Sequence, residues 1–125
     1  MLPIPNRTLL SGDYRLDMDF IGGMAGPVIT SRGCTAMCNF CSASRMFPGG
    51  IRTRPMDQVA REIAGLTENG RVKGLKVFDS TFTANRDHVL KFCETVKPFN
   101  IQWECEIRAD TVDFGLLRTM KEAGC

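Results

Sequence analysis

The sequence predicts an α/β fold built on a parallel sheet, and three observations support this prediction. Short β-branched or alternating segments are each followed by a segment with a helical hydrophobic period. This strand–helix order occurs three times between residues 27 and 125. Strands that alternate with helices form parallel sheets joined by right-handed crossovers. At 125 residues the chain has room for one domain at most.

Residues 1–26 precede the first predicted strand and are expected to form an extended lead-in or linker. They are rich in Pro and Gly and show no sustained hydrophobic period. A turn is expected at Gly26-Pro27, so that residues 27–125 form the predicted core.

The first strand–helix unit is a β-branched strand at residues 28–30 followed, after the cysteine-rich segment, by a helix that begins near Pro55. The apolar residues of this helix recur at helical spacing and are Val59, Ile63 and Leu66. Asn69-Gly70 is expected to end it.

The second unit has a strand at residues 75–78 and a helix capped by Asn85 and ended by Pro98. The apolar face of this helix is formed by Val89, Phe92, Cys93 and Val96.

The third unit begins with strict alternation over residues 101–107. The polar face of this strand, which consists of Gln102, Glu104 and Glu106, is expected to face a cavity. A last helix containing Leu116, Leu117 and Met120 follows, with Gly124 as its C-terminal cap.

Active-site residues of such folds lie at the carboxyl ends of the strands. The cysteine-rich segment follows the first strand, Asp79 follows the second, and Arg108 follows the third. We therefore expect these groups on one rim of the sheet.

The overall charge argues against nucleic acid or an anionic membrane as the main partner. With 16 basic and 14 acidic residues the net charge is only +2. The N-terminal residues lack a basic region followed by an apolar run, and no segment approaches the length of a spanning helix. We expect a cytoplasmic protein with reduced thiols.

Three of the six cysteines, Cys34, Cys38 and Cys41, lie within eight residues and indicate a metal site rather than a disulfide framework. Their spacing suits a 4Fe-4S cluster wrapped by one loop. A cubane has four irons, so three thiolates leave one iron open to a small molecule. A zinc site with a distant fourth ligand is the alternative.

The motif Cys-x3-Cys-x2-Cys, with the aromatic Phe40 before its last cysteine, resembles the radical S-adenosylmethionine (radical SAM) enzymes. This resemblance implies that S-adenosylmethionine binds the open iron. The reduced cluster would then cleave it to a 5'-deoxyadenosyl radical, which abstracts hydrogen from a substrate. The family's cofactor supplies this chemistry, while the protein positions the reactants.

Further segments resemble the cobalamin-associated branch of the family, namely residues 30–34, 78–83, 103–108 and 120–125. By this resemblance Asp79, Ser80 and Thr81 replace a Gly-Gly-Glu motif near the amino group of S-adenosylmethionine, and Phe40 lies near the adenine. Arg108 is a further candidate contact. Asp79 could instead cap a loop, and Arg108 could pair with Glu104 or Glu106.

The family's core is a partial (β/α)6, TIM-like barrel, of which this chain resembles the N-terminal half. We therefore expect a truncated or partner-dependent radical SAM protein. Possible partners are the missing barrel half, a cobalamin-binding domain absent from this chain, a flavodoxin or ferredoxin as electron donor, and a small-molecule substrate. The reaction outcome could be methyl transfer, methylthiolation or oxidative cyclisation. A non-enzymatic iron-sulfur or zinc-binding module is the alternative function.

The remaining polar candidates have simpler interpretations. Cys93 and Cys105 lie on apolar faces and are expected to be core thiols, and Cys125 is expected to be incidental. His88, in the first turn of a helix, is expected on the surface. Three arginines near the cysteines, which could steer an anionic substrate or be solvated, are Arg45, Arg52 and Arg54.

Overall fold

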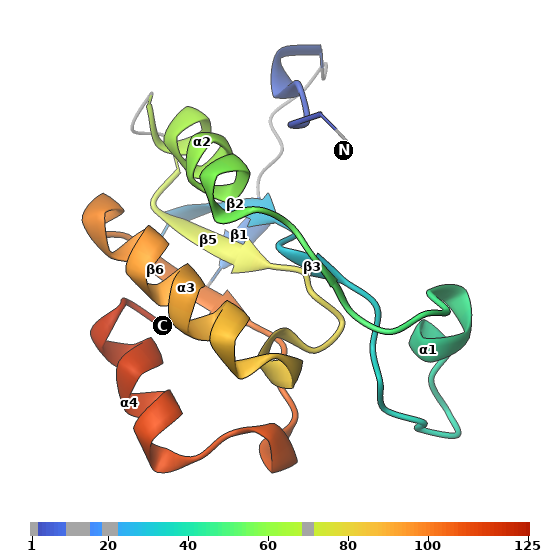
Figure 1. The fold of residues 1–125 in the computed structure, drawn as a ribbon. Helices are drawn as coiled ribbons and strands as arrows, with labels where there is room; N and C mark the ends of the chain where they lie inside the picture. The colour runs from blue at the N-terminus through green and yellow to red at the C-terminus, as the bar shows by residue number, and fades with distance from the viewer. Residues whose placement is uncertain (1–2, 10–15, 19–22, 69–71) are drawn as a thin grey trace.

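A four-stranded sheet with three helices packed on it forms the body of the protein (Figure 1). The computed structural model describes residues 3–9, 16–18, 23–68 and 72–125. The sheet has the order β1-β2-β5-β6, in which β1 is antiparallel to β2 while β2, β5 and β6 are parallel. Its strands are β1 (Leu16–Met18), β2 (Gly23–Val28), β5 (Gly74–Val77) and β6 (Gln102–Cys105).

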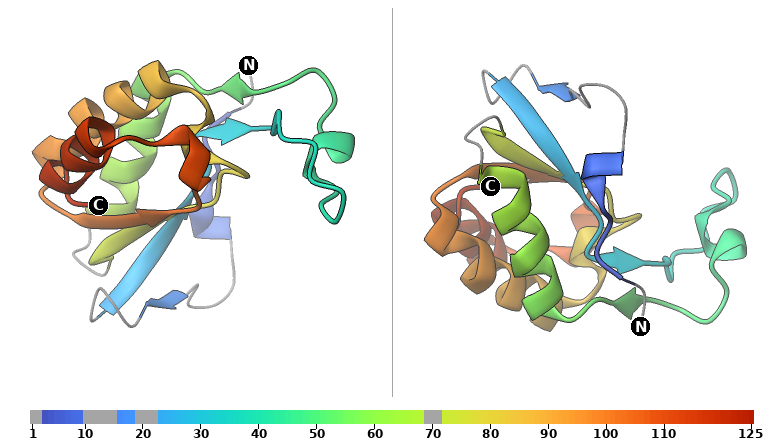
Figure 2. Two further views of the ribbon diagram at one scale, coloured as in Figure 1. Left: turned by 90° about the horizontal axis from the view of Figure 1, so that it is seen from below. Right: turned by 90° about the horizontal axis from the view of Figure 1, so that it is seen from above.

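The longer helices are α2 (Met56–Thr67), α3 (Arg86–Val96) and α4 (Phe114–Glu122). The smaller elements are α1 (Ala43–Met46), the two-stranded ladder of β3 (Ser31–Arg32) and β4 (Arg52–Thr53), and 3-10 turns at Arg7–Leu9, Phe82–Ala84, Lys97–Phe99 and Ala109–Thr111. Figure 2 shows α2, α3 and α4 on one face of the sheet. The predicted α/β class and the three parallel strand–helix units are confirmed.

The predicted lead-in contributes to the sheet. β1 lies within residues 1–26, and β2 begins at Gly23, so the expected boundary at residue 27 falls inside a strand. The turn expected at Gly26-Pro27 is wrong for the same reason. The Phe78 N–H, directly after β5, donates to the Val28 carbonyl at 2.8 Å, so the backbone polar groups of the neighbouring Pro27 face away from β5. The missing N–H of Pro27 therefore costs the β2–β5 ladder no hydrogen bond.

The core lies between the sheet and the helices, and an aromatic cluster fills its centre. Phe82, Phe92 and Trp103 come from three different elements, and their ring centroids are 5.0–5.6 Å apart in edge-to-face contacts. The Trp103 indole N–H donates to the Ala123 carbonyl at 2.8 Å, which satisfies its polar atom inside the core. These contacts attach α3 and α4 to β6.

The helix ends follow the sequence signals closely. The Asn85 side chain accepts a hydrogen bond from the His88 N–H at 3.1 Å, which confirms the predicted cap of α3. Gly124 has φ +98°, and the Cys125 N–H bonds to the Met120 carbonyl at 3.0 Å, as in a Schellman motif. A Cβ at Gly124 would lie 2.5 Å from the Ile101 carbonyl oxygen, so glycine is required there. Asn69-Gly70, the predicted stop of α2, lies outside the described residues.

The polar face of β6 carries ion pairs with the neighbouring strand. Lys76 of β5 donates to Glu104 and, at 3.4 Å, to Glu106. These carboxylates raise the pKa of Lys76, so its ammonium group stays charged. In the part of the chain that the structure describes, no helix is long and apolar enough to cross a membrane.

Candidate metal centre

The cysteine-rich segment forms a loop that projects from the carboxyl end of β2. The chain leaves the sheet through β3 and returns through β4, and the loop with α1 extends away from the body (Figure 1). Gly33 closes the base of this loop with φ +103°, where a Cβ would lie 2.1 Å from the Gly50 carbonyl oxygen. Only glycine fits this close approach of two backbones.

The three predicted metal-binding cysteines all lie on this loop as free thiols. Cys34 and Cys38 are half-buried and Cys41 is exposed. The Cys41 N–H donates to the Cys38 carbonyl at 3.1 Å, so a turn connects the last two. Among the described residues, no three Cys, His, Asp or Glu side chains are gathered closely enough to hold a metal ion.

The segment after β5 contacts the first cysteine. Cys34 Sγ lies 3.3 Å from Thr81 Oγ1, within hydrogen-bonding distance. Thr81 is buried, and its hydroxyl also donates to the Ser80 carbonyl at 2.7 Å. The structure thus brings Thr81 to the cysteine loop, while Ser80 is exposed.

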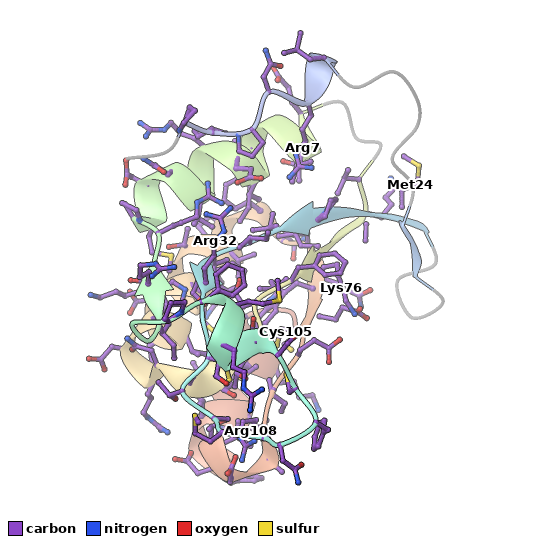
Figure 3. The ribbon with its side chains drawn as sticks, turned by 90° about the vertical axis from the view of Figure 1, so that its right-hand side faces the viewer. Arg7, Met24, Arg32, Lys76, Cys105 and Arg108 are labelled. Atoms are coloured by element: carbon purple, nitrogen blue, oxygen red, sulfur yellow. The ribbon has the colours of Figure 1, made fainter. Side chains whose placement is uncertain are left out.

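Arg108, which is labelled in Figure 3, contacts the second cysteine of the loop, Cys38. Its Nη1 donates to Cys38 Sγ at 3.1 Å, and its Nε and Nη2 donate to the Asp110 carboxylate at 3.0 and 2.6 Å. The Asp110 contact raises the pKa of Arg108 and lowers that of Asp110. The pairing with Glu104 or Glu106 is therefore wrong, because Lys76 binds both. A guanidinium beside sulfur is a favourable neighbour for a thiolate, the form of cysteine that binds metal.

Asp79 anchors the start of the cysteine loop. Its Oδ1 accepts from the Thr30 N–H at 2.7 Å, and its Oδ2 accepts from the Thr30 and Ser31 hydroxyls at 2.6 and 2.7 Å. With a residue exposure of 1%, the carboxylate is fully enclosed. This geometry fits the loop-capping interpretation and leaves the carboxylate almost no surface for a cofactor.

His88 is a buried member of the same network, so its predicted surface position is wrong. Its Nε2 lies 2.8 Å from Thr30 Oγ1. Because the Thr30 hydroxyl donates its one proton to Asp79, it accepts from His88, which therefore carries a proton on Nε2. Thr30 lies between β2 and β3, 58 residues before His88, and no local signal in the sequence connects the two residues.

The pKa of His88 leads to a prediction for stability against pH. Burial lowers this pKa below its ordinary value, and the Asp79 carboxylate opposes the shift. The unfolded ring protonates below about pH 6.5, whereas the folded ring stays neutral to lower pH. The stabilisation is therefore complete above that pH and decreases below it, by up to about 1.4 kcal/mol at pH 5.5.

Urea unfolding at pH 7.5 and 5.5 measures this loss, with His88→Gln as the control. Glutamine retains an N–H donor for Thr30 but does not titrate. Since His88 is the single histidine, the wild-type protein should lose more stability on acidification than the variant. Equal losses in the two proteins would show that His88 does not contribute.

Phe40 lies at the outer part of the loop and is 90% exposed. Two further exposed apolar side chains on this loop are Met37 and Met46. Phe40 directly precedes Cys41 in the sequence, and its exposed side chain is accessible to a group that binds at the cysteines. Its contact with adenine stays a prediction.

The other cysteines lie apart from the loop. Cys93 is buried in the core, as predicted, and burial raises the pKa of its thiol to about 11. Cys105 is half-buried, and its interaction with the Cys125 thiol raises the pKa of Cys105 and lowers that of Cys125.

Comparison with known proteins identifies the class of this fold and site. Residues 28–125 match the radical SAM superfamily. The chain belongs to this superfamily, whose members use a 4Fe-4S cluster and S-adenosylmethionine.

Two curated relatives are named as methyltransferases. An uncharacterized methyltransferase of Pyrococcus horikoshii is 33% identical over 127 residues, which cover 99% of this chain and 27% of the relative. The cytidylyl-2-hydroxyethylphosphonate methyltransferase of Streptomyces wedmorensis is 28% identical over 83 residues, which cover 66% of this chain and 16% of the relative. The chain thus spans about a quarter of the length of the first relative and about a sixth of the length of the second.

The residues present suit the cluster that the family implies. The donor set consists of three free thiols on one loop, and a hydroxyl and a guanidinium contact two of the sulfurs. Thiolates are the usual ligands of iron–sulfur clusters.

Proposed function

We propose that this chain binds a 4Fe-4S cluster through Cys34, Cys38 and Cys41 and takes part in the reductive cleavage of S-adenosylmethionine. The observation that carries this proposal is the position of the three thiols. They lie on one loop at the carboxyl end of β2, in a chain that matches the radical SAM superfamily over residues 28–125. When bound, the cluster supplies the electron that cleaves the sulfonium bond.

The surrounding residues hold and orient this loop. Asp79 fixes the loop base through Thr30 and Ser31, and Thr81 and Arg108 contact the sulfurs. We propose that exposed Phe40 and Ser80, together with Thr81 and Arg108, form the cofactor-binding side of the loop. For Asp79 we propose a positioning role, because its carboxylate is enclosed.

Among the possible outcomes we favour methyl transfer, which both relatives carry in their names. We also propose that the chain belongs to the cobalamin-associated branch and that its three strand–helix units are part of a (β/α)6 barrel. The parallel order β2-β5-β6, with α2, α3 and α4 on one face, supports the barrel assignment.

Anaerobic reconstitution with iron and sulfide, followed by electron paramagnetic resonance of the reduced protein, tests the proposal. We expect a 4Fe-4S signal that changes when S-adenosylmethionine is added, because the cofactor binds the iron without a cysteine. A cluster signal that S-adenosylmethionine leaves unchanged would support a non-enzymatic iron–sulfur module. A colourless zinc-loaded protein would contradict both.

A further inference from the structure

A cavity of about 850 Å³ lies beside the base of the cysteine loop. Its apolar wall consists of Ile29, Phe78 and four prolines, Pro3, Pro5, Pro27 and Pro55. The polar lining among the described residues consists of Thr53, Gln58, one glutamate and four arginines, namely Glu62, Arg7, Arg32, Arg52 and Arg54. This volume and mixed lining are typical of sites that bind small molecules.

Among the described lining residues Glu62 is the one carboxylate, and two arginines already neutralise it. Glu62 Oε1 accepts from Arg7 at 2.6 Å, and Glu62 Oε2 accepts from Arg54 at 2.7 Å. Arg54 also donates to the Ile29 carbonyl at 2.6 Å, and Arg7 donates to the Pro27 carbonyl at 2.6 Å. These contacts fix Arg54 in the lining of the cavity. The sequence also allowed a solvated surface position for this arginine.

Arg32 and Arg52 form a cationic pair at the same cavity. They are direct cross-strand partners in the β3–β4 ladder, and both are exposed. Arg52 donates to the Pro48 carbonyl at 3.2 Å, and within the described part of the chain Arg32 forms no ion pair. Like charges directly opposite each other destabilise a strand pair, whereas an anion between them would stabilise it.

We propose that this cavity binds a phosphate-bearing small molecule, with its phosphate held by Arg32 and Arg52. The guanidinium group matches phosphate oxygens in a bidentate manner. An apolar part of the ligand would contact Ile29 and Phe78. Figure 3 labels Arg7 and Arg32 near the β2 strand, well separated from Arg108. The net charge of +2 favours such a local anion site over a nucleic-acid surface.

Phenyl phosphate is a suitable probe because it combines a phosphate with an aromatic ring. Calorimetric titration of the metal-free chain should show saturable binding, and the double variant R32Q/R52Q should weaken it about tenfold or more. The charge-conserving R32K/R52K should retain a larger share of the affinity. The use of metal-free protein separates this test from the cluster proposal. Phenyl phosphate binding can be measured in a protein that fails to bind a cluster, and cluster binding can be measured in a protein that fails to bind phenyl phosphate.

Arg118→Gln is the matched control, since Arg118 is an exposed arginine of α4 paired with Glu122. It should leave phenyl phosphate affinity unchanged, and thermal unfolding should show that all three variants fold. Inorganic phosphate and phenol are the comparison ligands. Weaker binding of inorganic phosphate would support an apolar contact, and equal affinity would overturn it. Unchanged affinity in R32Q/R52Q, or equal binding of phenol, would overturn the phosphate site.

Discussion

Simultaneous replacement of Cys34, Cys38 and Cys41 by alanine is expected to abolish the uptake of iron and sulfide during anaerobic reconstitution. The variant removes all three thiols of the loop, and a 4Fe-4S cluster is held by cysteine thiolates. The effect should be complete, because the other cysteines are not on this loop: Cys93 is in the core, Cys105 ends β6 and Cys125 follows α4. Iron and sulfide analysis, with the absorbance of the bound cluster, measures the loss.

Cys93→Ala is the control for this experiment. Cys93 is buried against the core and is not on the loop, so its replacement should preserve iron uptake. It should reduce the free energy of unfolding by roughly 1 kcal/mol, because it leaves a small cavity. Retention of a full cluster in the triple variant would contradict the ligand assignment. Loss of the cluster in Cys93→Ala would show that iron uptake depends on overall stability.

The sequence predicted the three strand–helix units because their residues carry strong local signals. Val59 and Ile63 recur at helical spacing, and Asn85 is a good cap; all three have the expected role in the structure. The ladder of β3 and β4 could not be predicted in this way. It pairs residues about twenty positions apart, and charged residues such as Arg32 and Arg52 do not indicate a strand.

The site was predicted in part for the same physical reason. The cysteine spacing is a local pattern, and so is the position of Asp79 and Arg108 after strands. The partners of these residues depend on how strands pack side by side. Parallel pairing brings Thr30 beside Asp79 across a separation of 49 residues, and α3 then buries His88 against them. Hydrophobic periodicity does not carry this information.

Replacement of Asp79 by alanine is expected to destabilise the fold by about 3 kcal/mol and to weaken cluster assembly. The Thr30 N–H and the Thr30 and Ser31 hydroxyls all donate to this enclosed carboxylate. Without it these donors are buried and unpaired, and each such group costs about 1–3 kcal/mol. Urea unfolding at pH 7.5 measures the free energy of unfolding, and iron analysis after reconstitution measures cluster uptake.

The conservative Asp79→Asn separates the carboxylate's hydrogen bonding from its volume. An amide fills the same space but offers its NH2 group where Oδ2 or Oδ1 now accepts protons. The Thr30 hydroxyl oxygen already accepts from His88, and the hydroxyl proton is donated to Asp79 Oδ2. An asparagine amide nitrogen at the position of Oδ2 could not accept this proton. Asp79→Asn should therefore be less stable than the wild type but more stable than Asp79→Ala.

Asp57→Ala provides the matched comparison on the surface. Asp57 accepts from Arg61 at 3.0 Å on the exposed side of α2, and such an ion pair contributes at most about 0.5 kcal/mol. If Asp79→Ala were as mild as Asp57→Ala, the loop base would not depend on the carboxylate. If Asp79→Ala reduced the free energy of unfolding only slightly but prevented cluster uptake, Asp79 would act mainly by positioning Ser31, which lies three residues before Cys34. Either result would distinguish a stabilising network from one that positions the cysteine loop.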